Sequence, residues 1–211
     1  MKYLCENEVG FDSTMLGFPS IQGCQAIVYQ TSAGIYGFHS FGGSDKNSWQ
    51  PRAMKLREFI ESLGALTPAT RLYGCSFVSN NQRGYTGSST AGWRQELVRY
   101  ADMLGYHGKI SGYDLSKTLT GASDSAYVEY RINAKKCDVY IRKWDQFGSD
   151  ANIKYPKVGN TTPTEHRRLK SNKTGDTFTA VLADLEKGVV ISPTVGVDRN
   201  NLIKVSKQSL R

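Results

Sequence analysis

Residues 21–40 read IQGCQAIVYQTSAGIYGFHS, and this stretch decides the fold. Two parts of it, 25–30 (QAIVYQ) and 35–40 (IYGFHS), are rich in the β-branched and aromatic residues that favour strands. The four residues between them, 31–34 (TSAG), are mostly small or polar and end in glycine. Two strand-like runs joined by so short a connection predict a β-hairpin.

The register of this hairpin decides whether a cysteine and a histidine can meet. If Thr31 pairs with Gly34 across the turn, the numbers of every residue pair sum to 65. Ala26 then lies opposite His39, and Cys24, two residues before Ala26, points to the same face of the sheet. Cys24 and His39 become diagonal cross-strand neighbours, whereas a register shifted by one residue would place them on opposite faces.

Beyond the hairpin, hydrophobic spacing predicts both helices and strands. Helices are expected at 48–63 and 91–104, and strands at 72–78, 109–113, 126–132, 137–144, 178–185, 189–192 and 202–205. The polar stretch 149–175 is expected to be a solvated surface loop. Adjacent strands in runs, with only two helices, predict an α+β fold and not an alternating, doubly wound sheet.

Composition is consistent with a folded domain that has a basic surface. The 211 residues are 39% hydrophobic, which is enough for a core, and the net charge of +8 favours an acidic partner. No apolar run is long enough for a transmembrane helix, and the N-terminus lacks the apolar segment of a secretory signal. We therefore expect a protein that stays in the cytosol or leaves it without a cleaved signal peptide.

The four cysteines are expected to be free thiols. Cys5, Cys24, Cys75 and Cys137 are widely spaced and form no CxxC pair, so the spacing does not favour a zinc site. Without a secretory signal, a disulfide framework is not expected either. Cys75, inside the run LYGCSFV (72–78), is expected to be a core strand residue.

Cys24 and His39 have two interpretations. As catalytic groups, the imidazole would take the thiol proton and return it to a leaving amine, while the Gln22-Gly23-Cys24 amides stabilise an oxyanion. As structural groups, Cys24 would be a small core residue and His39 a packed residue at the end of a strand. Spacing alone leaves both interpretations open.

The order Ile21-Gln22-Gly23-Cys24, a strand, and a second strand ending in His39 resembles a motif of known glutamine deamidases. These are the cytotoxic necrotizing factor, Burkholderia lethal factor 1 and chemoreceptor deamidase families. The resemblance covers roughly residues 10–145 and implies a β-sandwich of mixed sheets flanked by two helices. It implies one domain over 1–211, with a core at about 10–145 and a C-terminal loop and strand extension at 146–211.

By this resemblance, Cys24 attacks a glutamine carboxamide, His39 is the base, and no cofactor or metal is needed. These families orient the histidine through a third group, in some members a threonine six residues before the cysteine. Phe18 occupies that position here, so we expect its backbone carbonyl to serve, with Ser20 and Thr14 as other candidates. Gly23 and Gln22 are expected to form the oxyanion site.

The resemblance also suggests a partner and a setting. The substrate is expected to be a host protein with a reactive glutamine and an acidic surface, modified by a monomeric bacterial toxin or effector. Such a protein would be made in the bacterial cytoplasm and then secreted or injected into the host cytosol. Transglutamination is open as a second outcome. Their positions in the chain, and not the resemblance, suggest substrate contacts at Asn81 and Tyr85, in the loop after the strand at 72–78, and at Trp49, which follows His39.

Two other functions remain as alternatives. One is a chemoreceptor-type glutamine deamidase, against which Phe18 and the additional C-terminal segment argue. The other is a non-enzymatic basic binding module in which Cys24 is structural. We do not expect nucleic acid as the partner, because the sequence shows no recognition motif.

Overall fold

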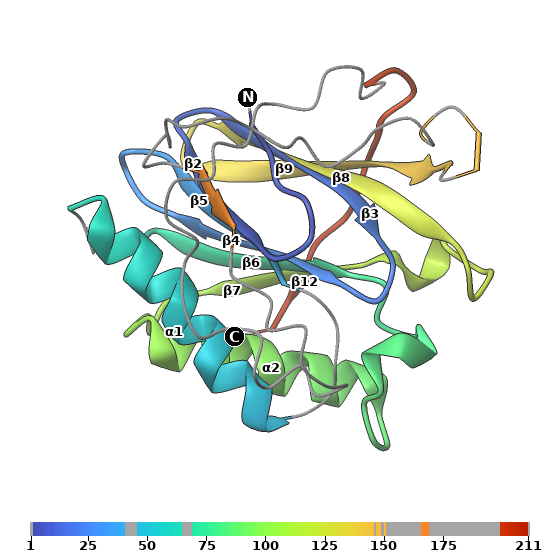
Figure 1. Cartoon of the computed structure of the whole chain (residues 1–211), viewed down its shortest axis with the longest axis horizontal. Coiled ribbons are helices and arrows are strands. Elements are labelled where there is room, and N and C mark those ends of the chain that lie inside the picture. The colour runs from blue at the N-terminus through green and yellow to red at the C-terminus, as the bar shows by residue number, and fades with distance from the viewer. Residues whose placement is uncertain are drawn as a thin grey trace.

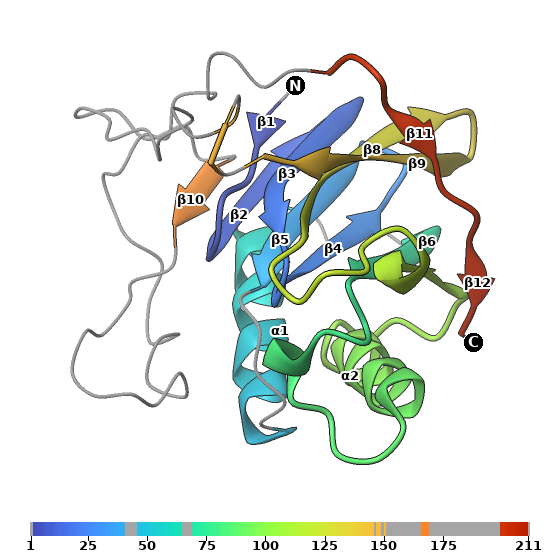
Figure 2. The ribbon, with the colours of Figure 1, turned by 90° about the vertical axis from the view of Figure 1, so that its right-hand side faces the viewer.

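A computed structural model describes residues 2–40, 46–64, 69–145, 147–148, 150, 166–168 and 199–210. It has three layers: a five-stranded sheet, a seven-stranded sheet, and two helices on the outer face of the second sheet (Figures 1 and 2). The predicted α+β class, with mixed sheets and two flanking helices, is confirmed. No helix in the described ranges is both long and apolar enough to span a membrane.

The five-stranded sheet has the order β1-β3-β8-β9-β11. Its strands are β1 (Lys2–Tyr3), β3 (Met15–Ile21), β8 (Ser125–Asn133), β9 (Lys136–Trp144) and β11 (Ile203–Lys204). The pair β1–β3 is parallel and the other pairs are antiparallel. Strands from both ends of the described chain therefore join one sheet.

The seven-stranded sheet has the order β10-β2-β5-β4-β6-β7-β12. Its strands are β10 (His166–Arg168), β2 (Glu8–Asp12), β5 (Ile35–Ser40), β4 (Gln25–Gln30), β6 (Arg71–Ser76), β7 (Ile110–Asp114) and β12 (Gln208–Ser209). Only the pair β6–β7 is parallel. The hairpin β4–β5 lies near the middle of this sheet, so neither of its strands is an edge.

The predicted hairpin register is confirmed. Ala26 pairs with His39, and the Thr31 N–H donates to the Gly34 carbonyl at 2.8 Å. Gly34 has a φ of +152°, and a Cβ there would lie 2.7 Å from the Asp12 carbonyl oxygen. Glycine is therefore required at the turn that sets the register.

The two helices match their predicted positions to within two residues at each end. They are α1 (Lys46–Ser62) and α2 (Ser89–Met103), and two short 3₁₀ helices are η1 (Asn81–Arg83) and η2 (Leu115–Lys117). Trp93, Leu97 and Tyr100 of α2 are fully buried against the seven-stranded sheet. The helical spacing of these apolar residues is the reason that this helix could be predicted.

Other predictions have mixed outcomes. Residues 202–205 do include an edge strand, β11, and the predicted strands at 178–185 and 189–192 lie outside the described residues. The expected surface loop 149–175 is described only at Asp150 and at 166–168. At 166–168 the loop prediction is wrong, because these residues form the strand β10, which pairs antiparallel with β2.

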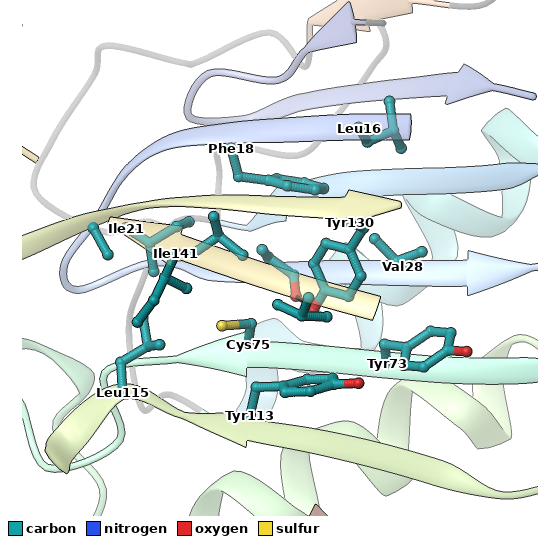
Figure 3. Close-up of a cluster of buried hydrophobic side chains, with 14 of the residues drawn as sticks. Leu16, Phe18, Ile21, Val28, Tyr73, Cys75, Tyr113, Leu115, Tyr130 and Ile141 are labelled. Carbon is teal, nitrogen blue, oxygen red and sulfur yellow. Dashed lines mark hydrogen bonds between the residues drawn. The ribbon is translucent and has the colours of Figure 1, made fainter. Parts of the chain in front are cut away.

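Two hydrophobic cores lie on either side of the seven-stranded sheet. Ile27 and Tyr29 of β4 face the helices, whereas Ala26 and Val28 face the five-stranded sheet. Cys24 belongs to this second, inter-sheet core, part of which is drawn in Figure 3. The alternation along β4 therefore directs Cys24 inward, between the sheets.

Candidate active site

Cys24 lies at the end of the short connection between β3 and β4. Cys24 is 5% exposed and packs in the inter-sheet core. Ala26 shares this core and pairs with His39 on β5. The hairpin thus places Cys24 and His39 on the same face of the sheet, as the register predicts.

One ring nitrogen of His39 has a defined partner. Nδ1 lies 2.7 Å from the backbone carbonyl oxygen of Leu4. A carbonyl oxygen can only accept, so Nδ1 carries the proton and donates it. The neutral form of His39 therefore has its lone pair on Nε2, the nitrogen that can accept a proton.

The environment keeps this imidazole neutral. His39 is 1% exposed, and its burial lowers the pKa to about 4, although the bond to Leu4 and the charge of Glu8 act in the opposite direction. Glu8 is itself buried, and its carboxylate accepts from the Cys5 N–H at 2.7 Å. At neutral pH His39 is thus an uncharged group that can act as a base.

His39 Nε2 is buried and has no hydrogen-bond partner in the described part of the chain. No hydrogen bond therefore joins it to Cys24 Sγ in this conformation. A buried ring nitrogen without a partner costs free energy and is unusual in a folded protein. This nitrogen is available to a partner that arrives when a substrate binds or a side chain rotates.

The residue that orients His39 differs from the expected one. A backbone carbonyl does orient the ring, but it belongs to Leu4 and not to Phe18. The Phe18 ring instead packs near the imidazole, with 6.2 Å between ring centroids. Thr14 donates to the Asp12 side chain, and Ser20 lies at an irregularity of β3 with a φ of +57°.

Leu4 reaches His39 because of two backbone contacts of the N-terminal segment. The Leu4 N–H donates to the Gly17 carbonyl at 2.7 Å, which extends the parallel pairing of β1 with β3. The Asn7 N–H donates to the carbonyl of His39 itself at 2.9 Å. A two-residue strand and a backbone carbonyl leave no pattern in the sequence, so sequence analysis missed Leu4.

The segment 22–24 is held in place by three side chains. Arg83 donates from Nη1 to the Gly23 carbonyl at 3.1 Å, and Ser76 donates to the Cys24 carbonyl at 3.1 Å. Gln22 donates from its own side chain to the Ala122 carbonyl at 2.9 Å. The predicted oxyanion segment is therefore fixed to β6, η1 and the loop before β8.

Arg83 belongs to a buried ionic network. It is fully buried and paired with the equally buried Glu96 of α2, and both bind the hydroxyl of Tyr85. Burial would lower the pKa of Arg83, but the charge of Glu96 outweighs it and raises the pKa, so the guanidinium stays charged. Glu96 shares the buried face of α2 with Trp93, Leu97 and Tyr100, a position that could have revealed it in the sequence.

The predicted substrate contacts fall into two groups. Tyr85 and Trp49 are buried or partly buried against each other, with ring centroids 6.4 Å apart, and the Tyr85 hydroxyl is occupied by the ionic network. Asn81 is exposed on η1, next to Gln82. Gln82 packs so closely on Gly23 that a Cβ there would lie 2.6 Å from its Oε1. The loop after β6 therefore does border the cysteine.

The other cysteines are poorly suited to be nucleophiles. Cys75 is fully buried, and burial raises the pKa of its thiol well above the usual value. Burial also raises the pKa of Cys137 to about 12. None of the four cysteines forms a disulfide, and no group of three or more His, Cys, Asp or Glu in the described ranges could hold a metal.

Access to Cys24 is restricted in this conformation. Neither Cys24 nor His39 lines any of four hollows in the described residues, of about 100 to 620 Å³, two of which lie beside Trp49. Any chemistry at Cys24 therefore requires a local opening.

Comparison with known proteins gives no relationship: the chain matches no family model and no curated protein. The candidate site therefore depends on its geometry alone.

The lowered pKa of His39 predicts a pH-dependent stability. The folded pKa of about 4 lies below the unfolded value of 6.5, so the unfolded state binds more protons between these pH values. Stability contributed by neutral His39 is present above pH 6.5 and is lost as pH falls to 4, by about 3 kcal/mol. In urea unfolding, His39→Gln should remove this part of the pH dependence, whereas the exposed His107→Gln should leave it unchanged. Equal slopes in the wild type and His39→Gln would contradict the buried neutral state.

The buried network predicts a coupled effect of Arg83 and Glu96. Arg83→Met should lower the free energy of unfolding by about 3–5 kcal/mol, because the Glu96 carboxylate is left buried without its counter-charge. The double variant Arg83→Met/Glu96→Met should recover part of that loss. The surface pair Lys143–Asp124, at 2.6 Å, is the control, and Lys143→Met should cost under about 1 kcal/mol. The comparison needs the single variant Glu96→Met as well. If the loss in the double variant, measured by urea unfolding, equals the sum of the losses in the two single variants, the buried pair is not coupled.

Proposed function

We propose that this protein is a cysteine-dependent protein-glutamine deamidase. The observation that carries the proposal is the state of His39, a neutral imidazole with Nδ1 bound to the Leu4 carbonyl and Nε2 without a partner. His39 shares a sheet face with Cys24. A thiol beside such a nitrogen can lose its proton to it and become a nucleophile.

The reaction uses two half-cycles at the same pair. His39 Nε2 takes the Cys24 proton, and the thiolate attacks the carboxamide carbon of a glutamine side chain. The tetrahedral intermediate collapses, the C–N bond breaks, and His39 returns the proton to the departing ammonia. His39 then takes a proton from water, whose oxygen attacks the thioester carbon. The C–S bond breaks, glutamate is released, and His39 returns the proton to the Cys24 sulfur.

Arg83 supports this chemistry through the peptide group that precedes the nucleophile. The Gly23 carbonyl, which accepts from Arg83, belongs to the same peptide group as the Cys24 N–H. A positive charge on the oxygen side of a peptide strengthens the N–H as a donor. The Cys24 N–H can thereby stabilise the oxyanion of the tetrahedral intermediate.

The substrate we propose is a protein that presents a glutamine side chain from an acidic surface. The net charge of +8 supports an acidic partner by long-range attraction. The role we propose is that of a bacterial toxin or effector acting in a host cell. Conversion of a neutral amide to a carboxylate would disable a target glutamine that has a catalytic role.

One observation favours a second function, a non-enzymatic basic binding module. Cys24 is 5% exposed and His39 1%, as expected of core residues. In this case His39 would fasten the N-terminal segment to the sheet through Leu4. The two functions differ in whether Cys24 Sγ ever reaches a substrate.

Replacing the nucleophile tests the proposal. Mass spectrometry of a eukaryotic cell extract should detect a glutamine converted to glutamate after incubation with the wild type. Cys24→Ser should abolish the conversion, because a hydroxyl is a far weaker nucleophile at neutral pH. His39→Gln should do the same.

Cys137→Ala is the matched control and should keep the activity. All variants should retain the circular dichroism spectrum of the wild type. Conversion that persists in a folded Cys24→Ser variant would contradict the assignment.

A further inference from the structure

A hollow of about 500 Å³ lies at one end of the inter-sheet layer. Its walls come from four parts of the chain that are distant in sequence: β6, β7, the start of β9 and residues 204–207. This volume lies in the range of small-molecule sites. The hollow is at the Arg71 end of β6, whereas Ser76 at the other end binds the Cys24 carbonyl, so it is separate from the candidate active site.

Two tyrosines line the inner part of this hollow. The rings of Tyr73 and Tyr113 are stacked, with centroids 6.4 Å apart, and their hydroxyls point the same way in Figure 3. The Tyr73 hydroxyl donates to Gln30 and accepts from the Cys137 N–H. The neighbouring Cys137 thiol lies 3.7 Å from Gln30 Oε1, and burial raises its pKa to about 12, so it is a lining group and not a nucleophile.

The charged groups around the hollow are mostly basic. Arg71, Lys136, Lys204 and Lys207 line it together with a single carboxylate, Asp138. Asp138 is paired with Lys204 at 2.8 Å. Lys136 also acts on the Asp138 carboxylate through its charge. Arg71 and Lys207 have no ion pair with a carboxylate among the described residues.

Arg71 gives the most specific indication of a ligand. It lies two residues from Tyr73 on the same face of β6, so its side chain is directed between the sheets. Its Nε is buried and has no hydrogen-bond partner in the described part of the chain. A buried donor of a charged group that lacks a partner is costly, and rotation of the guanidinium toward an anion in the hollow would give it one.

We propose that this hollow binds a small phosphate-bearing ligand. The planar guanidinium of Arg71 matches the oxygens of a phosphate, and Lys136 and Lys207 add two further charges. Four cations and one carboxylate give an excess of three positive charges, which favours a group of several negative charges over a single carboxylate. Residues 204–207 form one wall, so a bound ligand would fasten the C-terminal segment to β9.

Isothermal titration calorimetry with inorganic pyrophosphate tests the site on the full chain. The wild type should bind pyrophosphate at one saturable site, and binding should exceed that of an equal concentration of acetate. Arg71→Met should raise the Kd about tenfold or more, as should the double variant Lys136→Met/Lys207→Met. Lys117→Met removes the same charge from η2 and should leave the Kd within about twofold.

The variants also separate binding from folding. Arg71→Met should melt no lower than the wild type in the absence of ligand, because it removes a buried donor that has no partner. If Arg71→Met does not fold, the lysine double variant still carries the test. Absence of saturable binding, or equal weakening by Lys117→Met, would overturn the proposal. Neither outcome depends on whether Cys24 is catalytic.

Discussion

The pairing of β4 with β5 is the constraint on which the candidate site depends. Because side chains alternate along a strand, only a register in which Ala26 meets His39 puts Cys24 and His39 into the same layer. The turn that sets this register is closed by the Thr31–Gly34 hydrogen bond at a position that tolerates no Cβ. Both strands are flanked by others, so the register is fixed on both sides.

Around this pair, the backbone is held by polar contacts that are themselves buried. Leu4 fixes one ring nitrogen of His39, Ser76 holds the Cys24 carbonyl, and Arg83 holds the Gly23 carbonyl. The first contact holds β5, and the other two hold the connection that leads into β4. A rigid backbone with one imidazole nitrogen left without a partner is the arrangement that a pre-organised catalytic site needs.

The same arrangement restricts the access of a substrate to the Cys24 thiol. Cys24 lies in the same core as Phe18 and Ala26, so packing that stabilises the fold also covers the thiol. A local opening of a small part of the structure requires less free energy than global unfolding. In the proposed reaction, a local motion near Cys24, and not a rearrangement of the two sheets, would expose the thiol to a substrate.

Much of the fold follows from local patterns in the sequence. The hairpin was predictable from strand-forming runs around a glycine turn, and α2 from Trp93, Leu97 and Tyr100 at helical spacing. The contact of Leu4 with His39 was not, because it depends on a two-residue strand and on a backbone oxygen. The burial of Arg83 was not predictable either. Arg83 lies in a polar loop, and it becomes buried only because α2 places Glu96 beside it.

The most direct test of the account is the alkylation of native protein by iodoacetamide, followed by peptide mass spectrometry. We predict that Cys24 is labelled well before Cys75 and Cys137, and that His39→Gln slows the labelling of Cys24 alone. If Cys24 is labelled no faster than Cys75, and only under conditions that unfold the whole chain, the catalytic role of Cys24 and His39 is contradicted.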